Sequence, residues 1–298
     1  MRIGIPKTFF YYSYQPFLEN FFRDLGMEVV LGGPTDQEIL DRGRSVCVDE
    51  GCLPLKVLCG QVEKLSEACD KIVLPRIMKT EYGESICPKV AGAADLISTS
   101  REKMIFTKPL YLDCKKKLEK VLWKECRKLG IRKGTFKRSF FNGIEAQKKW
   151  QSGLNEQAYT FKVFLAGHCG NLQDSFVNMN LLKKLHAMDI GAVTEKQVKR
   201  TEKKKTLVYA ELIKKPYWSF FINHFTAMQE LKKTGIDGVI FVSSFSCGTD
   251  SFTIEMLKNN LQGLPMLVLK IDEQRGEAGF DTRLEAFCDV LKERSKKR

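Results

Sequence analysis

Three cysteines lie in short segments whose residue types favour thiolate chemistry. Cys52 occurs in DEGCLPLKV, Cys87 in ESICPKVAG and Cys247 in SSFSCGTDS. Two are followed closely by proline and one by glycine, so we expect each thiol where a strand or loop turns into a helix. Backbone N–H groups and the positive end of a helix dipole favour a thiolate at such a position. Three soft sulfur ligands brought together by the fold indicate an iron–sulfur cluster with one iron left without a cysteine ligand.

The spacing of these cysteines does not identify a metal site by itself. Cys52, Cys87 and Cys247 are separated by 35 residues (52 to 87) and 160 residues (87 to 247), whereas CxxC pairs mark most metal sites in sequence. A free cysteine is also among the most buried residue types, so each of the three could be a small core residue. A zinc protein or a metal-free structural protein therefore stays open at this point.

Ten cysteines are many for a chain with no sign of secretion. In a reducing compartment they favour metal binding or redox chemistry over disulfides. The helical patterns around them predict structural roles for four, namely Cys69, Cys114, Cys126 and Cys288. Helix burial is the preferred interpretation of Cys47 and Cys59, which flank Cys52. The roles of Cys47, Cys59 and Cys169 are not decided by the sequence.

Composition describes an ordinary globular protein of one large or two medium domains. The 298 residues are 43% hydrophobic and 29% charged, and no apolar run approaches the ~20 residues of a membrane span. The first residues, MRIGIPKTFFYY, read as a strand rather than a secretion signal. These features predict a cytoplasmic protein that does not enter a membrane.

The formal net charge of +13 comes largely from three lysine-rich runs, at 115–138, 195–205 and 292–298. Such charge could attract nucleic acid, an acidic protein, or the phosphates of a nucleotide or coenzyme A. The runs also contain glutamates and lack regularly spaced aromatic residues for base stacking. Solvated helix faces are therefore the preferred interpretation, and nucleic-acid binding is not expected.

Strands and helices alternate along the whole chain, which predicts parallel α/β layers. The strands are expected at 2–6, 27–31, 71–75, 161–167, 191–195, 238–244 and 265–272. Helices are expected at about 15–25, 35–45, 53–68, 175–188, 217–234, 250–260 and 281–294. Residues 101–155 are rich in lysine and show no clear strand. We therefore divide the chain into an N-terminal α/β lobe (1–100), a helical connector (101–158) and a C-terminal α/β lobe (159–298).

The two lobes form a loose repeat, and this repeat is the reason for grouping these three cysteines. Ligands of open parallel sheets bind at the carboxyl ends of strands. Cys87 and Cys247 each follow a predicted strand. If the two lobes face each other, the three thiols can meet in an interdomain cleft.

Two polar segments follow predicted strands and are candidates for the same cleft. GHCGNLQDSFVNMN (167–180) has neither GxGxxG nor GxxxxGK[ST], so nucleotide binding by those motifs is not predicted. Its His168, Asn171 and Asp174 could face the cleft, or could serve loop hydrogen bonding and helix capping. Glu277, flanked by two glycines, could be a cleft acid or could pair with Arg283. Asp281 or Thr282 would then cap the last helix.

An ordered set of segments resembles the 2-hydroxyacyl-CoA dehydratase superfamily. The segments are RIGIPKTFFYYSYQPF, VDEGCLPLKV, ICPKVAG, GHCGNLQDSFVNM, YWSFF, DGVIFVSSFSCGTDS and DEQRGEAGFDTRLEAF. They run from the first residues to about residue 290. The branch that the chain resembles is that of activase-related proteins, a domain of unknown function that accompanies acyl-CoA dehydratase activases.

The resemblance implies a fold, a cofactor and a partner. The fold would be two flavodoxin-like or Rossmann-like lobes, with a 4Fe-4S cluster held by three cysteines and one iron open to substrate. A related branch carries a double-cubane cluster. The matching positions in this chain are Cys52, Cys87 and Cys247. The implied partner is an ATP-dependent activase that delivers one low-potential electron, and the implied substrate is an acyl-CoA or another small molecule.

Two departures from the family pattern concern the site. Cys169 stands where the family usually has proline, and DEQRGEAG lacks a histidine that is common after the acidic pair. The chain also shows no ATP-binding signature, so the electron would come from a separate protein. These residues fit a low-potential redox enzyme or enzyme component. They also fit a non-catalytic electron relay, cluster carrier or regulatory subunit, and whether the protein is an enzyme stays open.

Overall fold

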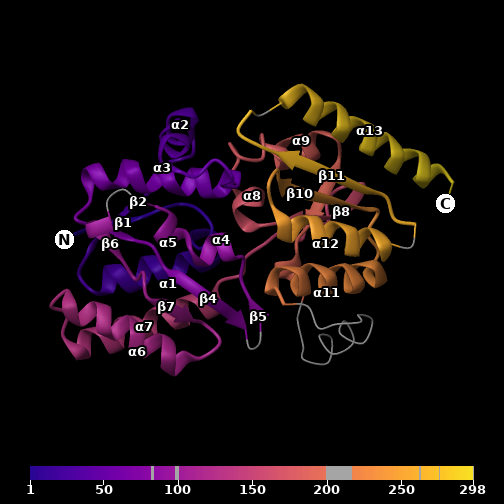
Figure 1. Cartoon of the computed structure of the whole chain (residues 1–298). Helices are drawn as coiled ribbons and strands as arrows, with labels where there is room; N and C mark the ends of the chain where they lie inside the picture. Colours follow the sequence, from indigo (N-terminus) through magenta and orange to yellow (C-terminus); the bar gives the residue numbers. More distant parts are fainter. Residues whose placement is uncertain (82–83, 98–100, 199–216, 262, 275, 298) are drawn as a thin grey trace. The chain divides into compact units, whose positions relative to one another are not determined.

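The computed structural model describes residues 1–81, 84–97, 101–198, 217–261, 263–274 and 276–297. The chain divides into two compact units, Met1–Gln151 and Ser152–Arg298. Each unit is an α/β structure around a four-stranded parallel sheet, as the sequence predicted (Figure 1). None of the helices in the described ranges is both long and apolar enough to cross a membrane.

The sheet of the first unit has the strand order β2-β1-β3-β6, and its strands are all parallel. Its strands are β1 (Arg2–Ile5), β2 (Glu28–Leu31), β3 (Lys71–Val73) and β6 (Met104–Ile105). Apolar side chains alternate across the sheet: Ile3 and Ile5 belong to one core cluster, whereas a Cβ at Gly4 would meet Leu65 of the opposite helix layer. This alternation buries both faces, as expected for a parallel sheet.

Helices cover both faces of this sheet (Figure 1). One layer contains α2 (Gln37–Val46) and α3 (Leu53–Ala68). The other contains α1 (Tyr11–Asp24), α6 (Lys115–Lys128) and α7 (Lys133–Lys149). Short pieces complete the unit: α4 (Pro88–Ala91), α5 (Ala93–Leu96) and the 3-10 turn η1 (Arg101–Lys103).

The expectation that residues 101–155 hold no clear strand is wrong. β6 lies in this range, and so does β7 (Pro109–Tyr111), which joins a second sheet in the order β5-β4-β7. The other members of that sheet are β4 (Arg76–Glu81) and β5 (Glu84–Ser85). β6 and β7 are two and three residues long, too short to show a period in the sequence, so only pairing with distant strands defines them.

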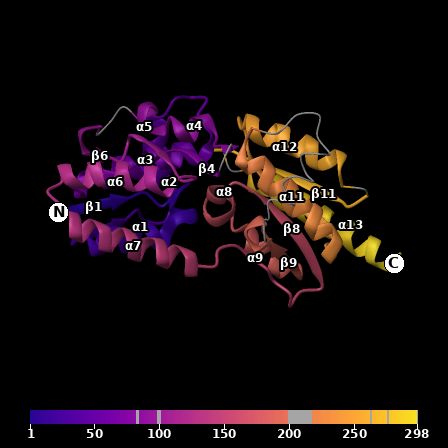
Figure 2. The same cartoon turned by 90° about the horizontal axis from the view of Figure 1, so that it is seen from below.

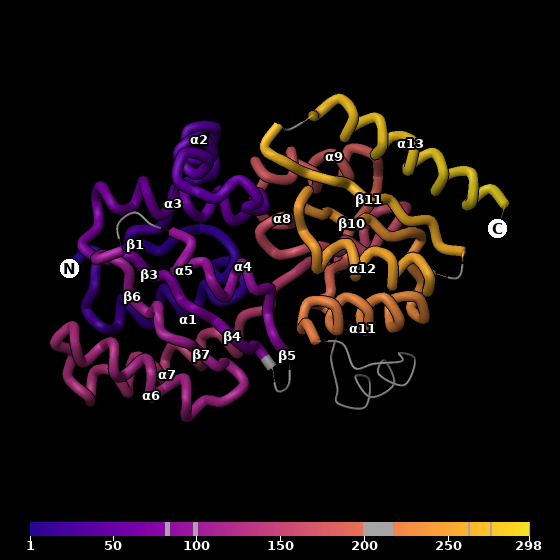
Figure 3. Tube along the Cα trace, in the orientation of Figure 1, coloured from indigo at the N-terminus to yellow at the C-terminus, as the bar shows by residue number. Residues whose placement is uncertain are grey.

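Helix α1 begins earlier than expected and is kinked. Tyr14 has non-helical φ and ψ, and Pro16 follows within the helix. The side-chain amide of Gln147, from α7, bonds the backbone groups that the kink leaves without a helical partner. Its Nε2 donates to Ser13 O at 3.0 Å, and its Oε1 accepts from Phe17 N at 3.3 Å. A side chain thus replaces one helical hydrogen bond. α1 and α7 lie side by side (Figures 2 and 3). An apolar cavity of about 200 Å³ lies beside the kink, and none of the cysteines lines it.

The sheet of the second unit has the strand order β11-β10-β8-β9, again with all strands parallel. Its strands are β8 (Phe161–Gly167), β9 (Ile190–Val193), β10 (Gly238–Ser244) and β11 (Met266–Ile271). The chain moves outward from β8 in one direction to β9, and then in the other direction to β10 and β11. The order therefore reverses between β8 and β10, which is where open α/β sheets bind ligands.

The helices of this unit lie on the two faces of its sheet (Figure 1). α11 (Ser219–Thr234) and α12 (Gly248–Asn259) cover one face, where they share an apolar core with β8 and β10. α9 (Leu181–Ala187) and α13 (Glu277–Lys296) lie on the other face. The remaining pieces are α8 (Cys169–Gln173) and the 3-10 turn η2 (Glu195–Gln197).

Two predicted helices of the second unit need correction. Of the helix expected at 175–188, only α9 is helical, and the short α8 lies before the expected start. Polar side chains bond the backbone between the two helices: Asp174 Oδ1 accepts from Val177 N, and Asn178 Oδ1 accepts from Leu181 N, both at 3.1 Å. Such side-chain contacts compete with helix formation. The last helix begins at Glu277, and its N-cap position is Gly276 rather than Asp281 or Thr282. Most of the basic run at 195–205 lies outside the described residues.

Candidate functional site

The candidate site of the second unit lies at the carboxyl ends of β8 and β10. These strands are neighbours, and the strand order reverses between them. His168 comes directly after β8, and Cys247 comes three residues after β10 ends at Ser244. The topology therefore brings an imidazole and a thiol, 79 residues apart in sequence, to one edge of the sheet.

Gly167 explains why the chain can turn sharply before His168. Its φ is 151°, a conformation that side chains rarely adopt. A Cβ at this position would lie 2.6 Å from Val242 O and 3.0 Å from Leu172 Cδ2. Only glycine lets β8 approach β10 this closely and still direct the next residue toward the site.

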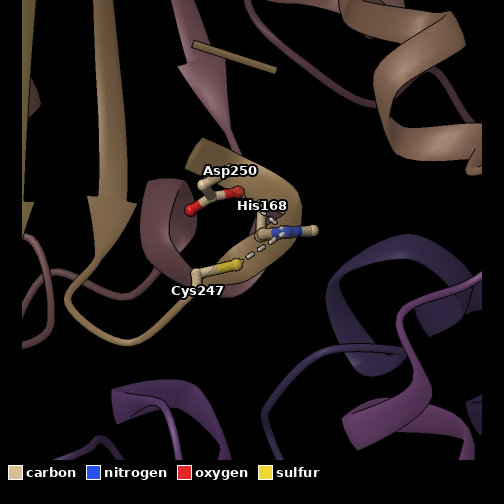
Figure 4. A group of neighbouring side chains, drawn as sticks. All are labelled: His168, Cys247 and Asp250. Carbon is tan, nitrogen blue, oxygen red and sulfur yellow. Dashed lines mark hydrogen bonds and ion pairs between the residues drawn. The ribbon is translucent and has the colours of Figure 1, made fainter. Parts of the chain in front are cut away.

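Cys247 occupies the N-cap position of α12, as the sequence predicted for the junction of a loop and a helix. Three polar atoms surround His168 Nε2: Asp250 Oδ1 at 3.1 Å, Thr249 Oγ1 at 3.5 Å and Cys247 Sγ at 3.9 Å. The hydroxyl of Thr249 is also 3.3 Å from Cys247 Sγ. Figure 4 shows the side chains of His168, Cys247 and Asp250 turned toward one another.

The carboxylate of Asp250 is the buried member of this group. Its side chain is 0% exposed, whereas that of His168 is 25% exposed. Burial opposes charge on both groups, but their mutual attraction outweighs it. The pKa of Asp250 therefore lies below its ordinary value, and the pKa of His168 lies well above, with Cys247 adding to the rise. The two residues therefore form an ion pair, with Nε2 and Oδ1 3.1 Å apart.

Aromatic packing fixes the orientation of the His168 ring. Phe220, from α11, stacks on it with ring centroids 3.7 Å apart. His224 also packs on Phe220, with ring centroids 4.1 Å apart. Its Nε2 accepts from Gly167 N at 3.2 Å, while its Nδ1 faces Phe220 O at 2.9 Å. His224 is therefore neutral with its proton on Nδ1, and burial lowers its pKa. These two neighbouring histidines thus differ in charge: His168 is charged, and His224 is neutral.

Asn171 and Glu277, two other polar residues expected near the site, make contacts that join secondary-structure elements. Asn171 is 0% exposed. Its Nδ2 donates to Val242 O at 3.3 Å, and its Oδ1 accepts from Ser244 Oγ at 3.1 Å, so it ties α8 to β10. Glu277 lies on the exposed start of α13, where it pairs with Lys184 of α9 at 2.8 Å.

In the first unit, Cys52 and Cys87 both precede helices. Cys52 is the N-cap of α3 and Cys87 is the N-cap of α4, and each helix has proline in its first two positions. The prediction that these thiols lie at loop-to-helix junctions is confirmed. One contact joins the two segments: Lys89 Nζ donates to Glu50 O at 2.6 Å.

Cys47 and Cys59, whose roles the sequence left open, lie together beside Cys52. They share a hydrogen bond, which lowers the pKa of Cys47 and raises that of Cys59. Nearby Lys56 and Lys89 also lower the pKa of Cys47, while burial and Cys52 add to the rise at Cys59. The thiolate form is thus favoured on the half-buried Cys47 and disfavoured on the buried Cys59.

The remaining cysteines differ in burial. Three of the four expected to be structural are buried: Cys69, Cys126 and Cys288. The fourth, Cys114, is half-buried at the N-cap of α6. Cys169 is half-buried and begins α8, immediately after His168.

The sequence interpretation missed Asp250 and Thr249. Both lie in the segment SSFSCGTDS, directly after Cys247, in the first turn of α12. The sequence did contain a signal for Asp250. An acid three residues after a helix N-cap lies in the first turn, close to the N-cap residue Cys247. Only the pairing of β8 with β10 reveals that His168 faces them.

The fold and this site define an α/β protein with a thiol, an imidazole and a buried carboxylate at a strand-reversal point. Comparison with known families gives two matches. Residues 2–198 match the family described as the CoA enzyme activase uncharacterised domain, and residues 226–291 match the 2-hydroxyglutaryl-CoA dehydratase D-component.

The first match covers more than half of the chain, so the chain belongs to the family of the CoA enzyme activase uncharacterised domain. Together the matches make it a 2-hydroxyacyl-CoA dehydratase-like protein, which confirms the resemblance predicted from the sequence.

Other comparisons add little. No curated protein matches the chain. Among solved structures, one similar chain is the SBP FpvC from Pseudomonas aeruginosa in complex with Mn2+. It is 14% identical, with 100% of both chains covered and a TM-score of 0.28. A similarity this low carries no argument about fold or function.

Proposed function

We propose that this protein is an iron–sulfur protein that acts as a low-potential redox enzyme or as a component of one. The observation that carries the proposal is the joint presence of the two family matches on one chain, with the three cysteines inside them. Cys52 and Cys87 lie within the first matched range, and Cys247 lies within the second. The electron donor would be an ATP-dependent activase or another low-potential donor. The substrate would be an acyl-CoA or another small molecule.

The residues present suit a cluster. Cys52, Cys87 and Cys247 are all half-buried, and none of them forms a disulfide in the part of the chain that the structure describes. Each stands at the N-cap of a helix. Thiolates are the ligands of 4Fe-4S clusters, and a double-cubane cluster is the second possibility that the family relationship raises. With one iron free of cysteine, a bound cluster would supply one-electron transfer and a Lewis-acid position for a reducible group.

The chain's own residues have supporting roles in this proposal. Lys89 fixes the Cys87 segment to the loop before Cys52 through Glu50 O. In the second unit, Asp250 and Phe220 hold the His168 ring with its Nε2 toward Cys247 Sγ. Hydrogen bonds to ligating sulfur atoms tune reduction potential. His168 is thus a candidate for that role.

The test is iron and acid-labile sulfide per chain after anaerobic purification, for the wild type and for Cys52→Ala, Cys87→Ala and Cys247→Ala. We expect about four irons in the wild type, or about eight for a double-cubane cluster, and most of the iron lost in each variant. Cys114→Ala is the matched control, since Cys114 is also a half-buried N-cap cysteine and should keep its iron. Full iron in all three variants would exclude the ligand assignment.

A second measurement separates an enzyme from an electron relay. An enzyme should change its EPR spectrum when a small ligand is added after reduction, and should turn over with activase, ATP and reductant. A relay, cluster carrier or regulatory subunit should show neither response while still containing iron and sulfide.

A further inference from the structure

The surroundings of His168 Nε2 are unusual for a hydrogen-bonded histidine. A carboxylate oxygen, a hydroxyl oxygen and a sulfur lie 3.1, 3.5 and 3.9 Å from this one nitrogen. A single N–H can be directed at only one of them. The same nitrogen faces both Asp250 and Cys247, so the group is not a Cys–His–Asp relay, in which the two ring nitrogens would face different partners.

The separations match those between ligands of one metal ion. A tetrahedral ion with metal–nitrogen and metal–oxygen bonds near 2.1 Å and a metal–sulfur bond near 2.3 Å holds its ligand atoms about 3.3–3.8 Å apart. The 3.1 Å from His168 Nε2 to Asp250 Oδ1 and the 3.9 Å to Cys247 Sγ lie on either side of this range. All three ligand atoms lie within 4.8 Å of one another. Small rotations of the side chains would complete the geometry.

Asp250 gives an independent reason to expect a cation. Its side chain is 0% exposed, and neither carboxylate oxygen makes a regular hydrogen bond to the described residues. Burying a carboxylate is costly unless it is fully paired or coordinates a metal. The closest cation is His168, whose Nε2 lies 3.1 Å from Oδ1, and Ser243 and Cys247 are further polar side chains that face the carboxylate. Figure 4 shows the Asp250 carboxylate beside His168 and Cys247.

The donor set indicates which ion fits. One imidazole nitrogen, one thiolate and one carboxylate are the mixed ligands of Zn²⁺ and of chemically similar ions such as Fe²⁺ and Co²⁺. Three protein ligands leave the fourth position of a tetrahedral ion for water or another small ligand. The stacked Phe220 holds the ring in place, so little conformational entropy would be lost on binding.

We propose that the second unit binds a single divalent transition-metal ion through His168 Nε2, Cys247 Sγ and the carboxylate of Asp250. This site needs no residue of the first unit. Cys247 cannot serve both this ion and a shared cluster, so the single-ion state belongs to the cluster-free chain. The two proposals are therefore tested on different forms of the chain, the single-ion site in the cluster-free form and the cluster in the anaerobically purified form.

The experiment uses Co²⁺, whose thiolate complexes absorb strongly, on the full-length chain carrying Cys52→Ala and Cys87→Ala. These changes remove two proposed cluster ligands and leave the single-ion site intact. We expect one equivalent of Co²⁺ to bind, with a sulfur-to-cobalt charge-transfer band and the intense visible bands of tetrahedral cobalt. Adding Cys247→Ser should abolish the charge-transfer band. Adding His168→Gln or Asp250→Asn should raise the Kd by about 10-fold or more, since loss of a residue that only supports a ligand already costs about 10–100-fold in affinity.

Matched controls keep the outcome interpretable. His186→Gln and Asp281→Asn change a histidine and an acid of the same unit, outside the group, and should leave Co²⁺ binding unchanged. Circular dichroism confirms that each variant is folded, and the iron-stripped wild-type chain serves as a second background if the double variant does not fold. Absence of thiolate–cobalt binding in folded protein, or binding that survives all three site substitutions, would overturn the proposal. Loss of iron from the Cys52 and Cys87 variants tests the cluster separately.

Discussion

At the residue scale, burial and hydrogen bonding decide the charge state of individual side chains. Tyr11 illustrates this in the first unit. It is 5% exposed, and its hydroxyl donates to Glu19 Oε1 at 3.0 Å. Glu19 also accepts from Gln15 and pairs with Arg23. Burial first, and then the hydrogen bond to Glu19, raise the pKa of Tyr11 to about 12.

This shift predicts a loss of stability at high pH. The unfolded chain releases the tyrosine proton near the ordinary pKa of 10.0, whereas the folded chain keeps it up to about 12. The contribution of Tyr11 is therefore complete below pH 10 and falls as the pH rises from 10 to 12, by about 1.4 kcal/mol per pH unit. Tyr11→Phe removes this slope. Urea unfolding of both proteins between about pH 8.5 and about pH 11.5 measures the difference.

Tyr217→Phe, at a position that is 67% exposed, is the control for general alkaline effects. A constant stability difference between wild type and Tyr11→Phe across that pH range would contradict the prediction.

At the element scale, two glycines set how closely α2 and α3 pack. A Cβ at Gly43 would lie 1.9 Å from Lys56 O, and a Cβ at Gly60 would lie 1.8 Å from Ile39 O. Backbone meets backbone at this crossing, so no side chain can adjust to make room. The crossing also fixes the chain between the two helices, because Cys47 ends α2 and Cys52 begins α3.

Gly60→Ala should therefore destabilise the first unit by about 1–3 kcal/mol or more, the usual cost of overpacking a core. Gly134→Ala provides a matched control in α7, where nothing lies within 4 Å of the added methyl group. That change should instead stabilise the helix by about 0.5–1 kcal/mol. Chemical unfolding of both variants checks the prediction, and equal effects of the two would show that α2 and α3 can separate without cost.

At the scale of the whole molecule, each unit has its own sheet and its own apolar core. Two core clusters lie within the first 151 residues, and a third is built from residues 164–261 of the second unit. Units of about 150 residues with separate cores are the size of ordinary folding domains. The proposed cluster ligands are divided between them, with two in the first unit and one in the second.

Residues 152–298, produced alone, should therefore fold and show a cooperative thermal transition by circular dichroism. If the three-cysteine cluster forms as proposed, neither unit alone should retain the iron and sulfide of the full chain. A gradual, non-cooperative transition of the isolated second unit would contradict its independence.

Local sequence patterns predicted many of the elements of this protein and its family. The main strands of both sheets, the N-cap positions of Cys52, Cys87 and Cys247, and the family all follow from short stretches of sequence, because burial periodicity and helix-start signals are local. The start of α1 was predicted less well, because the amide of Gln147 that bonds the backbone at the kink comes from 130 residues away.

Only the tertiary structure decided which side chains meet. β6 and β7 exist because distant strands pair with them. His168 and Asp250 form an ion pair because β8 lies next to β10. The pKa values of Cys47 and Cys59 diverge because α2 packs on α3. The sequence by itself determined most of the longer elements and the reactive residue types, since these depend on neighbours along the chain. Charge state and ligand sets depend on neighbours in space, and these were decided by the fold.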